Sequence, residues 1–172
     1  MAIIKATYTT RSAGAKASIR YIEHRPGKDG EKITRTLINS DGLMGRWQAY
    51  QMIDESQKGS IYFRFVISPD PKQEDQEKDL LLREITQKTM QTLEERLQKE
   101  VQWVAVEHND HAPHRHMHAV AIVPGRLRVQ DFQALRLKAT KACLEQRHER
   151  DLAREQKKLE QGREEEQWER EH

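Results

Sequence analysis

The pattern of apolar and polar positions along the chain predicts five strands. Short runs of β-branched and aromatic residues, and one stretch of strict alternation, have the two-residue period of a strand. These segments are residues 3–10, 32–39, 61–68, 101–108 and 115–123. Within the third segment one face, expected to be core, carries Ile61, Phe63, Phe65 and Ile67. The other face would carry Tyr62 and Arg64, and residues 32–39 would form a hairpin that turns at residues 40–42.

Helical spacing is expected between these strands and after the last one. The segments are residues 12–22, 46–55, about 74–100, and 131–144. Ser12 can cap the first helix, and Pro26-Gly27 ends it. This order predicts an α+β fold, an antiparallel sheet with helices packed mainly on one face, followed by a charged C-terminal helix.

The composition predicts one domain with a polar extension. The chain has 172 residues, 35% hydrophobic and 34% charged, which allows a core of modest size. We expect the domain at residues 1–144 and a charged helical extension at residues 145–172. The extension contains 7 Lys and Arg and 10 Asp and Glu, so its net charge is −3 and the domain retains +5. A modest positive excess is compatible with a phosphate-bearing partner.

Two absences in the sequence narrow the classes of protein. The single cysteine, Cys143, excludes an internal disulfide and is typical of a reducing compartment. No apolar run approaches the roughly 20 residues that span a bilayer, and the first ten residues lack the apolar region of a signal peptide. We therefore expect a soluble, cytoplasmic protein.

The strongest chemical signal is the segment EHNDHAPHRHMHAVAIV at residues 107–123, where five of the eight histidines lie within eleven residues. On a strand, His116 and His118 project from the same face. His108 ends the preceding strand, so an antiparallel hairpin would fold it back towards that pair. Three neutral imidazoles suit Mn²⁺, Zn²⁺, Co²⁺ or Ni²⁺ and leave coordination positions open for chemistry.

Other interpretations of these histidines stay open. One is a solvated histidine-rich loop, and another is a closed structural zinc site, which usually needs a fourth ligand and often cysteine. His114 is a competing ligand, whereas His111 is expected in a loop.

A candidate nucleophile lies near the N-terminus. All four tyrosines precede the histidines, and Tyr21 stands in the segment SIRYIEHR, next to Arg20 and close to His24 and Arg25. Such basic surroundings favour a phenolate and attract a phosphate. The alternative is that Tyr21 is an amphipathic residue on a helix face.

The segment SIRYIEHR, followed by His108-x-Asp110 and His116-x-His118, resembles the relaxases, the HUH-type nicking enzymes of conjugative and mobilisable plasmids. The likeness covers roughly residues 3–123 and is greatest to the mobilisation proteins. It implies that Tyr21 attacks single-stranded DNA at an origin of transfer and forms a 5′-phosphotyrosine link. It also implies that the three histidines bind Mg²⁺ or Mn²⁺, that Asp110 orients a ligand or accepts the phenol proton, and that accessory relaxosome proteins take part.

Residue order separates the relatives that share the histidine pair. In rolling-circle initiators and single-tyrosine transposases the catalytic tyrosine follows the histidines, whereas here no tyrosine follows Tyr62. The order therefore indicates the relaxase arrangement. Many relatives also have a serine motif between tyrosine and histidines, for which Ser60 and Ser68 are the candidates.

The sequence also predicts which residues contact DNA. Phosphate contacts are expected from Arg20, Arg25, Lys32, Arg35 and Arg64. Residues 32–39 would track the strand, and binding would weaken steeply as salt rises. Two rival functions remain, a metal-dependent hydrolase in which Tyr21 is passive and a non-catalytic DNA-binding module with a structural metal.

Overall fold

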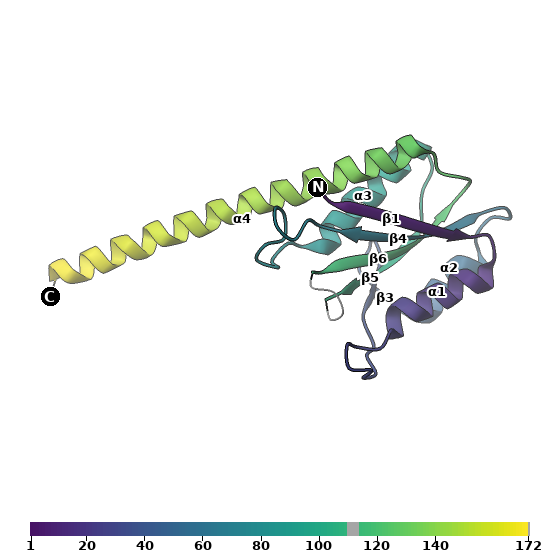
Figure 1. Ribbon diagram of the computed structural model, residues 1–172, viewed down its shortest axis with the longest axis horizontal. Coiled ribbons are helices and arrows are strands. Elements are labelled where there is room, and N and C mark those ends of the chain that lie inside the picture. Colours follow the sequence, from purple (N-terminus) through teal and green to yellow (C-terminus); the bar gives the residue numbers. More distant parts are fainter. Residues whose placement is uncertain (110–113, 172) are drawn as a thin grey trace.

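A computed structural model describes residues 1–109 and 114–171 (Figure 1). Six antiparallel strands form one sheet in the order β1-β4-β6-β5-β2-β3. The strands are β1 (Ile3–Thr9), β2 (Leu37–Ile38), β3 (Leu43–Met44), β4 (Ile61–Ser68), β5 (Trp103–His108) and β6 (His116–Val123). The helices are α1 (Ser12–His24), α2 (Arg46–Asp54), α3 (Leu82–Leu97) and α4 (Val129–Glu171). The predicted α+β class and antiparallel sheet are confirmed.

The sheet has a core on each face, which differs from the expectation that helices pack mainly on one. Helices α3 and α4 cover one face, and α1 and α2 cover the other (Figure 1). The sequence of β5 gives the reason. Trp103 and Ala105 pack into the core under α3 and α4, whereas Val104 and Val106 pack into the core under α1 and α2. A strand that is apolar on both sides must be covered on both sides.

Two elements are shorter than the sequence predicts. The hairpin keeps only β2 and β3, and β2 meets β5 at the single pair Ile38↔Ala105. The preceding loop is held instead by backbone hydrogen bonds, one of which runs from the Arg35 amide to the Glu23 carbonyl (2.9 Å). Lys32 consequently lies in a loop and not on a strand. Helix α3 begins at Leu82, eight residues later than expected at residue 74, because turns held by hydrogen bonds to Asp70 and then to Asp75 occupy residues 70–80.

Helix α4 runs for 43 residues without a break and crosses the predicted boundary between residues 144 and 145. The last buried residue of α4 is Arg147, whose guanidinium donates a hydrogen bond to the Asp79 carboxylate at 2.7 Å. Beyond that point the helix projects from the domain with exposed side chains (Figure 1). Among the described residues, no helix combines the length and the apolar character that crossing a membrane requires.

Candidate active site

The β5–β6 hairpin brings three histidines together as its register predicts. His108 on β5 pairs directly with His116 on β6, and His118 follows on the same face. All three side chains are buried, and one nitrogen of each lies within 4.8 Å of the others. His114 is half-buried outside this group, and its carbonyl lies 3.5 Å from Nδ1 of His116.

The hydrogen bonds of the cluster leave nitrogen atoms available for a cation. His108 donates from Nε2 to the carbonyl of Ile22 at 2.9 Å, so its Nδ1 carries the lone pair. That Nδ1 is buried and has no hydrogen-bond partner within the described parts of the chain. Nε2 of His116 and Nε2 of His118 lie 3.2 Å apart. Three converging imidazole nitrogens, one of them an unpaired acceptor, fit a single divalent ion.

Burial keeps these imidazoles in the form that binds metal. Desolvation lowers the pKa of His108 to about 4, although the Ile22 hydrogen bond opposes it, and the charge of Arg35 adds to the lowering. Desolvation likewise lowers the pKa of His118 to about 3, with further contributions from His108 and His116. Both rings are therefore neutral near pH 7, as a metal ligand must be.

Tyr21 lies on the same side of the sheet as the histidines. It precedes Ile22, the residue whose carbonyl binds His108, and its side chain is 47% exposed. The guanidinium carbon of Arg64 is 5.7 Å from the centre of the Tyr21 ring, a cation–π contact. Arg64 pairs with Val120 while Val66 pairs with His118, so the arginine stands one step along the histidine face.

The other tyrosines are engaged elsewhere. The hydroxyl of Tyr62 lies 2.6 Å from Oγ of Ser56 in the core between the sheet and α2. Tyr8 packs against Phe63 on the opposite face, and Tyr50 is half-buried beside Trp47. Tyr21 is thus the exposed tyrosine on the histidine face.

An ion-pair network holds the end of α1 that carries Tyr21. Glu23 is buried and accepts a hydrogen bond from Nε of Arg46 on α2 at 3.0 Å. His24 contacts the same guanidinium and lies 3.3 Å from the hydroxyl of Thr34. Sequence reasoning missed Glu23 and Arg46, because a carboxylate in a short helix gives no sign of burial and its partner is 23 residues away.

Only some of the residues predicted to contact DNA lie near the histidines. The charges of Arg25 and Arg35 act on His108, those of Arg25 and Arg64 act on His118, and Arg35 also donates to the carbonyl of Arg25 at 2.6 Å. These three arginines therefore surround the histidines. Arg20 is exposed on α1 and Lys32 is exposed in the following loop. The predicted Asp110, together with His111, lies outside the described residues.

A small polar groove lies beside the Arg64–Tyr21 contact. It has a volume of about 220 Å³ and is lined by α1, β1 and β4, with Thr7, Ser18 and Arg64 among its side chains. Gly14 also lines it, and a Cβ there would come within 2.9 Å of the Thr9 hydroxyl, so glycine lets α1 approach β1 closely. The sequence gives no periodic signal for Thr7 or Ser18.

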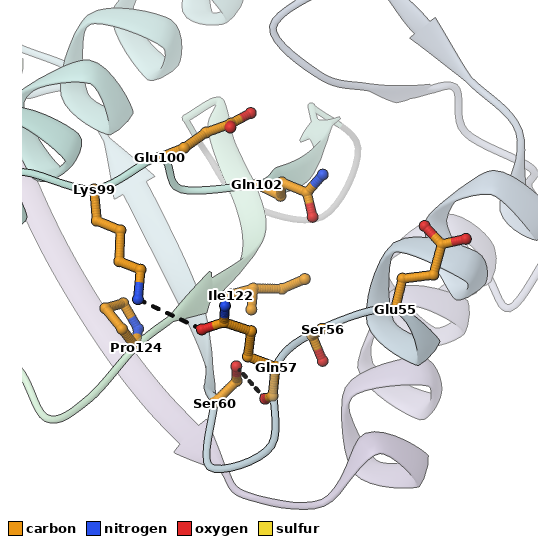
Figure 2. Close-up of a pocket in the computed structure, with 9 residues that line it drawn as sticks. All are labelled: Glu55, Ser56, Gln57, Ser60, Lys99, Glu100, Gln102, Ile122 and Pro124. Carbon is orange, nitrogen blue, oxygen red and sulfur yellow. Dashed lines mark hydrogen bonds between the residues drawn. The ribbon is translucent and has the colours of Figure 1, made fainter.

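A separate cavity of about 290 Å³ lies at the other end of β6 (Figure 2). Ile122 and Pro124 line it, whereas the histidines are at the opposite end of this strand. Figure 2 shows Lys99 reaching the Gln57 side chain there, with Glu55 and Glu100 also lining the cavity. Nζ of Lys99 lies 3.5 Å from Oε1 of Gln57. This cavity is therefore remote from the histidine cluster.

Comparison with known families agrees with this arrangement. Residues 21–152 match the family model described as relaxase, MobA/VirD2-like, nuclease domain. The matched segment begins at Tyr21, includes all three histidines and extends into the exposed part of α4. No curated protein and no solved structure matches the chain.

Proposed function

Because the chain belongs to the MobA/VirD2-like relaxases through its nuclease domain, we propose that it nicks and rejoins one strand of DNA at an origin of transfer, with Tyr21 as the nucleophile. The observation that carries this proposal is the hydrogen bond between His108 and the Ile22 carbonyl. It ties the histidine cluster to the residue next to Tyr21, while Arg64 extends from the sheet to the tyrosine ring.

The proposed reaction is a transesterification. The phenolic oxygen of Tyr21 attacks the scissile phosphorus, a P–O bond to tyrosine forms, and the bond to the 3′ oxygen breaks. The phenol proton passes to a base, for which the sequence predicts Asp110, and the 3′ oxygen leaves as a hydroxyl after taking a proton. The tyrosyl phosphodiester conserves the bond energy, so the 3′-OH can reverse the step without ATP.

His108, His116 and His118 would hold a divalent ion beside the phosphate. When bound, the ion would polarise the phosphate and offset the charge that develops during attack. We predict Mn²⁺ or Mg²⁺, and among these an all-imidazole set favours Mn²⁺ because Mg²⁺ prefers oxygen ligands. Neutral imidazoles leave the full charge of the ion available to the phosphate.

The surrounding arginines and the polar groove provide a path for the strand. Arg25, Arg35 and Arg64 are placed to attract phosphates around the histidines. The hydroxyls of Thr7 and Ser18 line the groove next to Arg64 and can donate to the backbone of a single strand. We propose that the DNA runs over this groove, along the surface formed by α1 and the edge strand β1, on its way to Tyr21.

The decisive experiment is detection of a covalent adduct. The full chain, Mn²⁺ and single-stranded oligonucleotides from the origin, labelled at the 3′ end, would be resolved on a denaturing gel. We expect a labelled protein band that Tyr21→Phe abolishes. Tyr50→Phe is the matched control, because Tyr50 is half-buried beside Trp47 on α2 and lies outside the groove, and it should retain the adduct.

Two outcomes would overturn the proposal in different ways. Metal-dependent cleavage without an adduct, at an undiminished rate in Tyr21→Phe, would show a hydrolase that uses water. DNA binding without cleavage in wild type, under conditions where the ion is bound, would show a binding module.

A further inference from the structure

Helix α4 carries an apolar stripe that the fold leaves uncovered. Its members are Leu137, Leu144, Leu152 and Leu159, which are 61%, 48%, 45% and 60% exposed. They follow one another at steps of seven or eight residues, so at about 100° per residue they fall within an arc of about 80° on the helix surface. Four regularly spaced exposed leucines on a charged helix form a continuous surface about 33 Å long.

The stripe points away from the domain. The buried residues of α4, among them Leu135, Ala139 and Gln146, occupy the opposite side of the helix and pack towards the sheet and α3. From Asp151 to Glu171 every side chain of the helix is exposed. Because most helical stability in proteins comes from the packing of an amphipathic face, a partner along the stripe would stabilise this part of the helix.

The sequence of the stripe is symmetric about His148. Leu137 and Leu159 lie eleven residues on either side of it, and Leu144 and Leu152 lie four residues on either side. Lys141 and Glu155 lie seven residues on either side, within the same arc. Two such helices in antiparallel orientation, related by a two-fold axis at His148, would place leucine against leucine and Lys141 against Glu155.

We propose that a second copy of this chain covers the stripe, so that two α4 helices pair antiparallel about His148. Charge complementarity selects this occupant and this direction. Antiparallel pairing opposes a lysine to a glutamate at both ends of the seam, whereas parallel pairing in register would oppose Lys141 to Lys141 and Glu155 to Glu155. The two domains would lie on the outer sides of the helix pair, because each core face is opposite its stripe.

This dimer does not rest on the proposed nicking reaction, and its test needs no DNA. Light scattering after size exclusion would be run on the full chain from about 1 to about 100 µM, the range in which weak homodimers dissociate. We expect a mass approaching twice 20.3 kDa at the upper end. The double variant Leu144→Glu with Leu152→Glu should remain a monomer, whereas Leu43→Glu, at a 78% exposed leucine outside α4, should still dimerise.

A charge exchange tests the direction of pairing. Lys141→Glu and Glu155→Lys should each weaken the dimer at least several-fold, and the two together should restore it. His148→Cys should form an intermolecular disulfide across the axis, because the native Cys143 is buried and does not compete. A monomer throughout the concentration range would overturn the proposal. So would a dimer that the double leucine variant leaves intact, or one that is cross-linked through Leu159→Cys, because parallel pairing brings the two 159 positions together whereas antiparallel pairing holds them about 33 Å apart.

Discussion

At the scale of single residues, the site depends on how burial and charge are combined. His108 and His118 lose water on entering the sheet, which lowers their pKa values and keeps them neutral, while the charges of Arg25, Arg35 and Arg64 act on them. Charged groups at the rim and neutral ligands at the centre suit a site that must attract a polyanion and also hold a cation. Arg64 acts on His118 through its charge and also contacts the Tyr21 ring, so it lies between the histidines and the tyrosine.

Replacing Arg64 tests that role. We expect Arg64→Gln to slow adduct formation about 100-fold, because one positive charge near the attacked phosphate is removed. Arg64→Lys should retain part of the rate, since the charge remains but the planar guanidinium is lost. Quenched reactions sampled over time would measure the rates. The exposed Arg163→Gln on α4 is the control, and an unchanged rate in Arg64→Gln would contradict the assignment.

At the scale of elements, a few long-range hydrogen bonds and ion pairs hold the helices in position. Glu23 and Arg46 join α1 to α2, and the amide of Leu81 donates to the Gln146 side chain, which fixes α4 beside the start of α3. Asp79 completes the attachment of α4 by accepting hydrogen bonds from both Arg147 and Arg154. The attachment of the long helix is therefore partly electrostatic.

This attachment predicts a pH dependence of stability. The hydrogen bond from Arg147 holds the pKa of Asp79 below its ordinary value of 3.8, so Asp79 stabilises the fold above that value and the contribution is lost as pH falls through the lower, folded-state pKa. We expect Asp79→Asn to cost on the order of 1 kcal/mol of unfolding free energy near neutral pH and much less near pH 2.

Urea unfolding at several pH values would measure this difference. Arg154→Gln should reproduce part of the effect, because Arg154 also binds Asp79 but is more exposed. Lys157→Gln on the exposed part of α4 is the neutral control. A cost that does not change between neutral and acid pH would show that Asp79 acts by packing and not by charge.

At the scale of the whole molecule, the histidine cluster connects parts that are distant in the chain. Its ligands come from β5 and β6, and His108 reaches α1 through Ile22. A bound ion would therefore stabilise the sheet together with α1, which carries Tyr21, and its binding should be visible in global stability.

Metal addition tests that coupling. After chelation, Mn²⁺ should raise the melting temperature, by the equivalent of about 2.7 kcal/mol when free ion is 100-fold above its Kd. His118→Ala should lose most of this shift. His114→Ala should keep it, because His114 is close in sequence but outside the cluster. Differential scanning fluorimetry of each variant with and without Mn²⁺ measures the shift, and the reverse ranking would identify His114 as the ligand.

The clustering of the three histidines was accessible from the sequence because it follows from local spacing. Strand alternation places His116 and His118 on one face, and a hairpin register returns His108 to them, so neither inference needs distant contacts. The α+β order also follows from the period of each segment. The role of Arg64 beside Tyr21 could be suspected only as part of a basic set, since the contact joins residues 43 positions apart.

Tertiary structure alone decided the features that depend on contacts between remote segments. The two cores arise because the central strands are apolar on both sides, and the hairpin at residues 32–39 shortened because backbone bonds to the end of α1 replaced strand pairing. The buried Glu23–Arg46 pair was likewise outside the reach of local patterns. The period of a segment shows which of its faces is apolar. Which element covers that face is determined by the packing of the whole chain.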